Sequence, residues 1–164
     1  DTSGNSLDGL VKGATLTTDR DGNPNRAYRF NGKIFDNGTT TYIELPLSSL
    51  TQNLEQSDYS VVAWVKPESD PPGSDSNWYA YGIIHNNKDY GLRYHYRPTL
   101  EMSNHLYYDN GTNLNWGGQQ SGYQYSGKYY HVAGVVSVTN RTTTIYINGQ
   151  AAGWGSQKWR EWEF

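Results

Sequence analysis

One pair of segments constrains the fold of this chain most, because its pattern is that of paired antiparallel strands. Side chains alternate between two faces along residues 128–136 and again along 144–147, as half-buried strands require. The second segment runs into Asn148-Gly149, a residue pair that readily supplies the two positive-φ positions of a type I′ turn. The sequence therefore predicts two antiparallel strands followed by a tight hairpin turn.

Most of the remaining chain also has the pattern of short strands. Alternating runs are separated by Gly, Asn, Asp and Ser, and helical periodicity is confined to a short turn at 48–50. About ten strands favour an all-β fold of two packed antiparallel sheets, in a single domain over 1–164. The predicted strands are Ala27–Asn31, Thr41–Leu45, Tyr59–Lys66, Tyr81–His85, Tyr90–Arg97, Glu101–Tyr108, Tyr129–Val138, Thr143–Asn148, Gln150–Gly155 and Lys158–Phe164.

The composition excludes several classes of protein. The 164 residues include no Cys, so disulfides and thiolate metal sites are excluded, and a core must form without them. Lys and Arg number 13 against 16 Asp and Glu, and a net charge of −3 argues against a nucleic-acid partner. No apolar run reaches the roughly 20 residues of a membrane span. No signal-peptide pattern follows Asp1, so an exported protein is expected to start here in its mature form.

Several short motifs occur in an order that is typical of one family. They are Asp-x-Ser-Gly-Asn at 1–5, Gly-Ala-Thr-Leu-Thr-Thr-Asp-Arg at 13–20, Asn-x-Ala-Tyr-x-Phe-x-Gly at 25–32, Tyr-Ile-Glu-Leu-Pro at 42–46, Trp-Val-Lys-Pro at 64–67, Tyr-Tyr-His-Val-Ala-Gly-Val at 129–135 and Ile-Asn-Gly at 147–149. The chain thus resembles the laminin-G-like, concanavalin-A-like jelly-roll modules of secreted bacterial and archaeal proteins. The resemblance implies a two-sheet antiparallel jelly-roll sandwich, an extracellular or cell-surface location, and a non-catalytic carbohydrate-binding or adhesion role.

A hairpin around Pro98 supplies the first candidate binding residues. If Pro98-Thr99-Leu100 form a three-residue loop, Arg93 pairs with His105 and His95 with Ser103. One face of the hairpin is then polar, and the opposite face, with Tyr94, Met102 and Leu106, should meet the other sheet. The resemblance implies that a concave polar face of this kind holds a glycan. The candidate residues on it are Arg93, His95, His105 and Tyr107.

Aromatic side chains in polar loops supply further candidates. The chain has 6 Trp, 15 Tyr and 3 Phe, and several of the larger rings lie beside Gly, Asn, Ser and Gln, where a ring has no obvious core to enter. Trp78 and Trp116 are the strongest of these, because the amides around Trp116 can hydrogen-bond to sugar hydroxyls in both directions. The alternative is that such rings cover the ends of the sheets or contact a neighbouring subunit.

Two Asp- and Asn-rich loops point to calcium. The loop from Asp1 to Asn5 resembles one that lies close to a structural calcium ion in related modules, and Asp19 and Asp21 place oxygen donors at alternate positions. Calcium takes six to eight oxygen ligands from flexible loops of this kind. The sequence therefore predicts Ca²⁺ with Asp1, Asn5, Asp19 and Asp21 as ligands. The alternative is that both loops are Asx-turns, which use the same residues for local hydrogen bonds.

Catalysis has little support in the sequence. A retaining glycosidase needs two carboxyl groups about 5 Å apart, and the only pair at that spacing within a predicted strand is Glu161 and Glu163 in the terminal Trp-Arg-Glu-Trp-Glu-Phe. That segment lacks the Glu-x-Asp-x-x-Glu pattern of the glucanase branch. We therefore expect no enzyme activity.

The termini suggest a second class of function. Related modules usually carry a strand before the first loop and further strands after the Asn-Gly turn, so the resemblance implies a sandwich that lacks its terminal edge strands. Open edges favour self-association, because they expose unpaired backbone groups. The expected partner is a glycan or cell-surface polysaccharide. The alternative is a structural subunit of an extracellular filament or surface assembly, completed by a strand from a neighbour.

Overall fold

Every regular element in the described part of the chain is a β-strand. The computed structural model describes residues 1–32, 40–48, 57–69, 80–85, 91–95, 99–103, 117–120, 127–137, 139–140, 142–151 and 157–158. The strands are β1 (Leu10–Lys12), β2 (Thr15–Thr17), β3 (Ala27–Arg29), β4 (Tyr42–Glu44), β5 (Tyr59–Val65), β6 (Ala80–His85), β7 (Gly91–His95), β8 (Thr99–Ser103), β9 (Gly117–Gln120), β10 (Tyr130–Ser137), β11 (Thr142–Ile147), β12 (Gln150–Ala151) and β13 (Gln157–Lys158).

The chain separates into two compact units, Asp1–Asn53 and Leu54–Phe164. The first unit holds two antiparallel ribbons, one of β1 with β4 and one of β2 with β3. Several large apolar side chains of these ribbons are exposed, among them Leu10 at 56% and Leu16 at 53%. A two-stranded ribbon buries little apolar surface by itself. The sequence did not predict β1 and β2, and it correctly predicted strands at β3 and β4.

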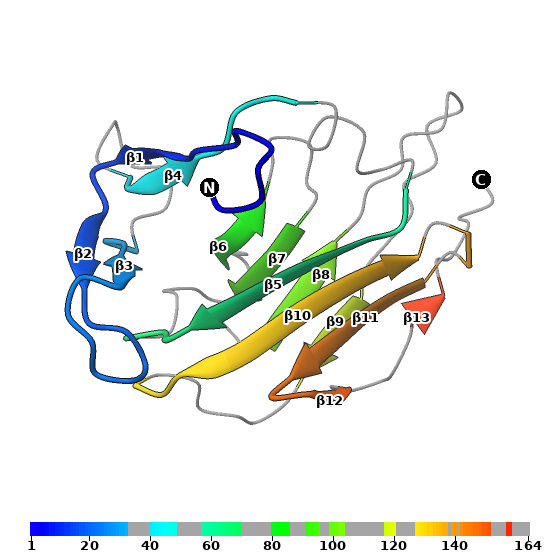
Figure 1. The fold of residues 1–164 in the computed structure, drawn as a ribbon. Coiled ribbons are helices and arrows are strands. Elements are labelled where there is room, and N and C mark those ends of the chain that lie inside the picture. The colour runs from blue at the N-terminus through cyan, green and yellow to red at the C-terminus, as the bar shows by residue number, and fades with distance from the viewer. Residues whose placement is uncertain are drawn as a thin grey trace. The chain divides into compact units, whose positions relative to one another are not determined.

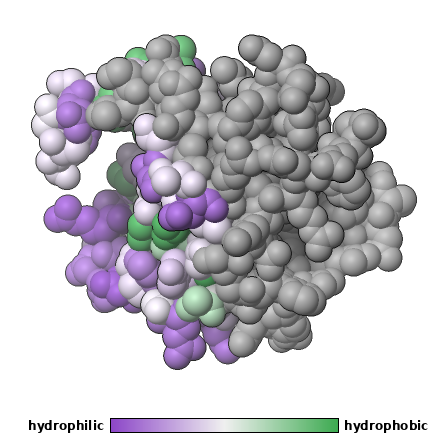
Figure 2. All heavy atoms as spheres, turned by 90° about the vertical axis from the view of Figure 1, so that its right-hand side faces the viewer, coloured by the Kyte–Doolittle hydropathy of each residue, from purple (hydrophilic) through white to green (hydrophobic). Residues whose placement is uncertain are grey.

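The second unit is built from two antiparallel sheets, which Figure 1 shows. One sheet has the order β12-β11-β10-β5, with β13 also paired to β11, and the other has the order β6-β7-β8-β9. A shared core joins them, because Leu92 of β7 packs with Val132 and Val136 of β10 and with Ile145 of β11. This two-layer arrangement is the predicted β-sandwich. Figure 2 shows a face on which the described residues are mostly hydrophilic, with small hydrophobic groups between them.

The pairing of β10 explains which side chains enter the core. Val132 lies opposite Ala63 of β5 and Ile147 of β11, and every second residue of β10 faces the same way. Val132 is 0% exposed and Val136 is 1% exposed, whereas Ala133 and Val135 between them are only partly buried. Each buried Val or Ile contributes about 1.5–3 kcal/mol to folding, as an upper estimate.

The predicted type I′ turn is present between β11 and β12. Asn148 and Gly149 have φ angles of 51° and 80°, and Ile147 pairs with Gln150 across the turn. Gly149 accepts the left-handed conformation without strain, and Asn is among the residues that tolerate it best. The turn fixes the register of β11 and therefore determines which of its residues face the core.

Candidate functional site

The outward face of β5 carries large side chains that are half open to solvent. Exposure alternates strictly along this strand, because Tyr59, Val61, Ala63 and Val65 face the core. Val62 is 53% exposed and Trp64 is 48% exposed. Burying an indole fully is strongly favourable, so a strand Trp that stays half exposed has a surface available for contact with another molecule.

Trp64 forms a ring pair with His131 of β10. The two residues are direct cross-strand partners, and their ring centroids lie 5.2 Å apart with the planes tilted by 59°. Asn148 holds the backbone beneath this pair, because the His131 amide donates to Asn148 Oδ1 at 3.0 Å and the Asn148 amide donates to the His131 carbonyl at 2.8 Å. The turn that sets the register of β11 thus also fixes the strand position that carries His131.

The positively charged side chain of Lys66 lies beside this ring pair. Lys66 follows β5, and its Nζ is 5.6 Å from the ring centroid of Tyr129, the residue that precedes β10. Val65 pairs with Tyr130, so Lys66 and Tyr129 occupy the next positions along the two strands. Strand alternation places Lys66 on the same face of the sheet as Trp64, and Tyr129 on the same face as His131. We call Trp64, Lys66, Tyr129 and His131 the aromatic face.

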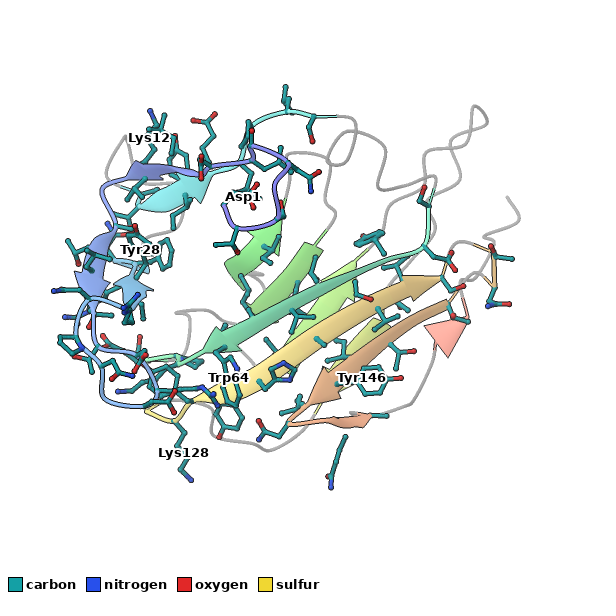
Figure 3. All side chains as sticks on the ribbon, in the orientation of Figure 1. Asp1, Lys12, Tyr28, Trp64, Lys128 and Tyr146 are labelled. Carbon is teal, nitrogen blue, oxygen red and sulfur yellow. The ribbon has the colours of Figure 1, made fainter. Side chains whose placement is uncertain are left out.

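The aromatic face continues across the sheet toward β11. Ala133 of β10 lies between Val62 of β5 and Tyr146 of β11, and Tyr146 in turn pairs with Ala151 of β12. Figure 3 labels Trp64 on β5 and Tyr146 on β11, at the two sides of β10. Small side chains at the centre and rings at the sides form a surface suited to a flat ligand. The imidazole, ammonium and phenol groups add polar partners that can bond hydroxyl groups.

Of the residues predicted to bind a glycan, only Arg93 and His95 are among the described residues. Arg93 and His95 belong to β7, whose backbone pairs with β6 and β8. Trp78, His105, Tyr107 and Trp116 lie outside the described residues. Leu92, the neighbour of Arg93, is 0% exposed and belongs to the core. The role of Arg93 and His95 in binding stays a prediction.

The predicted register of this hairpin is wrong. Arg93 pairs with Glu101 and not with His105, and His95 pairs with Thr99 and not with Ser103. Thr99 and Leu100 therefore belong to β8 and not to a connecting loop. The partner of each residue lies four positions earlier than predicted, and an even displacement keeps the same residues on the same face. The prediction failed because Pro98 was placed at the start of the turn, whereas β8 starts immediately after it.

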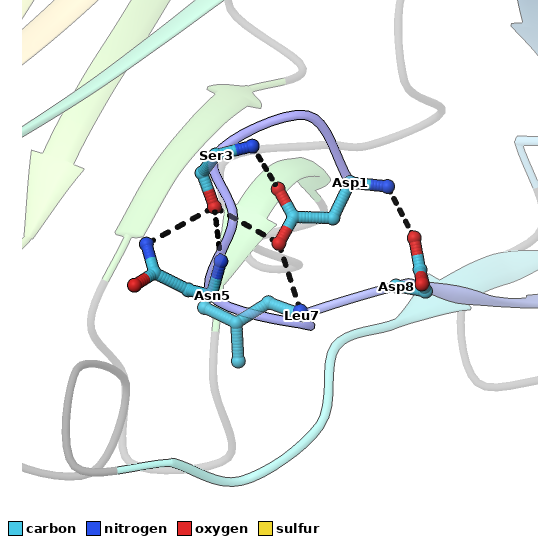
Figure 4. A network of polar contacts seen from close by, with 5 residues as sticks. All are labelled: Asp1, Ser3, Asn5, Leu7 and Asp8. Atoms are coloured by element: carbon cyan, nitrogen blue, oxygen red, sulfur yellow. Dashed lines mark hydrogen bonds and ion pairs between the residues drawn. The ribbon is translucent and has the colours of Figure 1, made fainter.

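The loop at the N-terminus is closed by its own side chains (Figure 4). The Asp1 carboxylate accepts hydrogen bonds from the Ser3 amide at 2.8 Å, the Ser3 hydroxyl at 2.9 Å and the Leu7 amide at 2.8 Å. The Asn5 side-chain amide donates to the Ser3 hydroxyl at 3.0 Å, and the Asp1 amino group forms an ion pair with Asp8. This is the local bonding of an Asx-turn.

The loop around Asp19 has the same character. One Asp19 carboxylate oxygen accepts from the amides of Asp21 at 2.9 Å and Asn23 at 2.8 Å, and the other accepts from the Asn23 side chain at 3.2 Å. The hydrogen bond from the Asn23 amide is the main cause that lowers the pKa of Asp19. A lowered pKa in the folded state stabilises the loop at neutral pH, and this contribution is lost as the pH falls through the lowered pKa.

These donor sets do not fit a calcium ion as they are arranged. Both carboxylate oxygens of Asp1 and of Asp19 receive N–H or O–H donors, and calcium needs six to eight oxygen ligands. Within the described residues no three acidic or His side chains cluster closely enough to hold a metal. The geometry favours the Asx-turn alternative, and calcium binding stays a prediction of the sequence.

That prediction has a direct test. If calcium binds the folded chain through Asp1, Asn5, Asp19 and Asp21, millimolar CaCl2 should raise the melting temperature relative to EDTA, because a ligand of the folded state stabilises it by mass action. An Asp19→Asn, Asp21→Asn variant should lose the increase. Superimposed melting curves for the wild-type chain would leave both loops as hydrogen-bonded turns.

Two further predictions concern catalysis and the crossing of a membrane. Glu161 and Glu163, the carboxylate pair considered for catalysis, lie outside the described residues. None of the described residues forms a helix long and apolar enough to cross a membrane.

The sequence contains a signal for the aromatic face that the prediction did not use. Tyr59, Val61, Ala63 and Val65 form one alternating set along β5, so Trp64 must share the opposite face with Val62. Register with β10 then pairs Trp64 with His131. The sequence prediction selected rings in polar loops, and it treated the Trp-Val-Lys-Pro motif only as a mark of resemblance.

Comparison with known proteins agrees with this fold. Residues 37–162 match the family described as the concanavalin A-like lectin/glucanases superfamily, and the match includes both sheets of the second unit. Searches of curated proteins and of solved structures find no match. The family match extends over most of the chain, and the antiparallel two-sheet arrangement is the one its name implies. The chain belongs to the concanavalin A-like lectin/glucanases superfamily.

Proposed function

We propose that this protein is a non-catalytic, extracellular carbohydrate-binding or adhesion module, and that its ligand lies on the aromatic face. The observation that carries the proposal is Trp64, whose ring is held beside His131 on the outward face of a sheet and is 48% exposed. An exposed ring face offers apolar contact to the C–H groups of a sugar, and the neighbouring polar groups can bond its hydroxyls. Family membership supports the same class of ligand.

Binding to a panel of immobilised polysaccharides tests the proposal. Trp64→Ala should weaken binding at least about tenfold, equivalent to about 1.4 kcal/mol, because a central ring commonly dominates a small interface. Thermal unfolding should change little, since the side chain is half exposed. Trp64→Phe keeps a ring and should retain part of the affinity. Val62→Ala is the control, because it shortens an exposed side chain on the same face without removing a ring.

The polysaccharide panel also distinguishes a ligand site on the aromatic face from the ligand site predicted around Trp78 and Trp116. If Trp116→Ala or Trp78→Ala abolishes binding while Trp64→Ala does not, the ligand site lies in the loops and not on the aromatic face. If the wild-type chain binds no polysaccharide, the carbohydrate-binding function itself is wrong.

The filament alternative receives less support from the described residues. Its proposed donor strand begins at Lys158, and β13 (Gln157–Lys158) pairs with Thr142 and Thr143 of β11 in the same chain. A segment that completes its own sheet is not available to a neighbour at those positions.

A further inference from the structure

We propose that the aromatic face binds an anionic saccharide, with Trp64 against the sugar ring and the Lys66 ammonium at a carboxylate or sulfate substituent. This inference rests on the proposed function and deepens it by naming the class of ligand. Its basis is the position of Lys66 beside the exposed indole, one residue past the end of β5 and on the same side of the sheet as Trp64.

The spacing of the two side chains suits one substituted sugar. Trp64 and Lys66 are two residues apart on an extended segment, which separates their Cα atoms by about 7 Å. A ring stacked on the indole can therefore present an exocyclic charged group to Lys66. His131 and Tyr129 lie opposite them on β10 and provide further polar partners.

The ammonium of Lys66 is held on this face. Its Nζ is 5.6 Å from the Tyr129 ring centroid, a distance at which the ring attracts a cation. The ring occupies one side of the ammonium, and the remaining N–H donors of an exposed lysine can bond an anion. Within the described residues Lys66 forms no ion pair with a carboxylate. Glu68, the nearest acid in the sequence, follows Pro67 beyond the end of the strand.

The test compares three probes by isothermal titration calorimetry at low salt. They are a uronic-acid trisaccharide, its carboxyl-reduced neutral analogue and a sulfated trisaccharide of the same linkage. The wild-type chain should bind at least one anionic probe about tenfold more tightly than the neutral one, and the preferred probe shows whether the anion is a carboxylate or a sulfate. The preference should fall as NaCl is raised, because the charges are exposed.

Three variants locate the effect. Lys66→Gln should remove the anionic preference and lower the affinity for the anionic probes much more than the affinity for the neutral analogue, and Lys66→Arg should retain the preference. Lys128→Gln is the matched control, because it removes the same charge from a lysine that extends away from the sheet beside the start of β10 (Figure 3). That variant should keep the preference.

The outcomes distinguish this inference from the function on which it rests. Equal binding of all three probes by the wild-type chain, or a preference that survives in Lys66→Gln, overturns the anionic ligand and leaves the carbohydrate-binding function intact. If none of the probes and no polysaccharide of the panel binds, both proposals fail.

Discussion

Ile145→Ala should lower the free energy of unfolding of the second unit by about 2–5 kcal/mol. Ile145 is 2% exposed, lies at the centre of β11 and packs with Leu92, Val132 and Val136. Its loss removes three buried carbon atoms from a position where both sheets contribute side chains, so neither sheet can close the cavity without moving the other. The measurement is equilibrium unfolding in urea, followed by tryptophan fluorescence and circular dichroism.

The control for this variant is Val62→Ala, on the opposite face of the same sheet. Val62 is 53% exposed, and its truncation should change stability by no more than about 0.5 kcal/mol. If Ile145→Ala costs no more than Val62→Ala, Ile145 does not lie in a core shared by two sheets.

The strands that the sequence predicted well are those with both a clear alternation and a clear boundary. The predicted strand Tyr59–Lys66 corresponds to β5, and Asn148-Gly149 forms the expected turn. The strand β9 was missed, because Gly117, Gly118 and two Gln residues have little strand propensity of their own. Pairing with β8 makes it a strand, and pairing between distant segments is not visible in local composition.

The candidate site was harder to predict than the fold for a related reason. Sequence alternation places Trp64 and Lys66 on one face, but it does not say which strand lies beside them. Only the register of β5 with β10 brings His131 to Trp64 and Tyr129 to Lys66. The Asp-rich loops present the opposite case, because their residue types suit both calcium binding and Asx-turns, and the hydrogen bonds of Asp1 and Asp19 favour the Asx-turn.

Thr143→Val is expected to stabilise the second unit by about 1–3 kcal/mol. Thr143 is 0% exposed and lies opposite Val136 on the inward face of β11, and its hydroxyl has no hydrogen-bond partner among the described residues. Folding therefore removes this hydroxyl from water without replacing its hydrogen bonds. Val has nearly the same shape as Thr and carries a methyl group in place of the hydroxyl, so the substitution removes the cost and leaves no cavity.

Two further substitutions test whether the Thr143 hydroxyl causes the expected gain in stability. Thr143→Ser keeps the hydroxyl and removes a buried methyl group, so it should destabilise the unit by about 1 kcal/mol. Thr144→Val replaces the next residue, which is 8% exposed, points to the other face and has an interaction partner, so no gain is expected there. A loss of stability in Thr143→Val would mean that the Thr143 hydroxyl is bonded in solution. A gain would mean that strand alternation along Thr142, Thr143 and Thr144 places the Thr143 side chain in the core. There its β-branched shape packs well, and its unbonded hydroxyl lowers the stability of the unit.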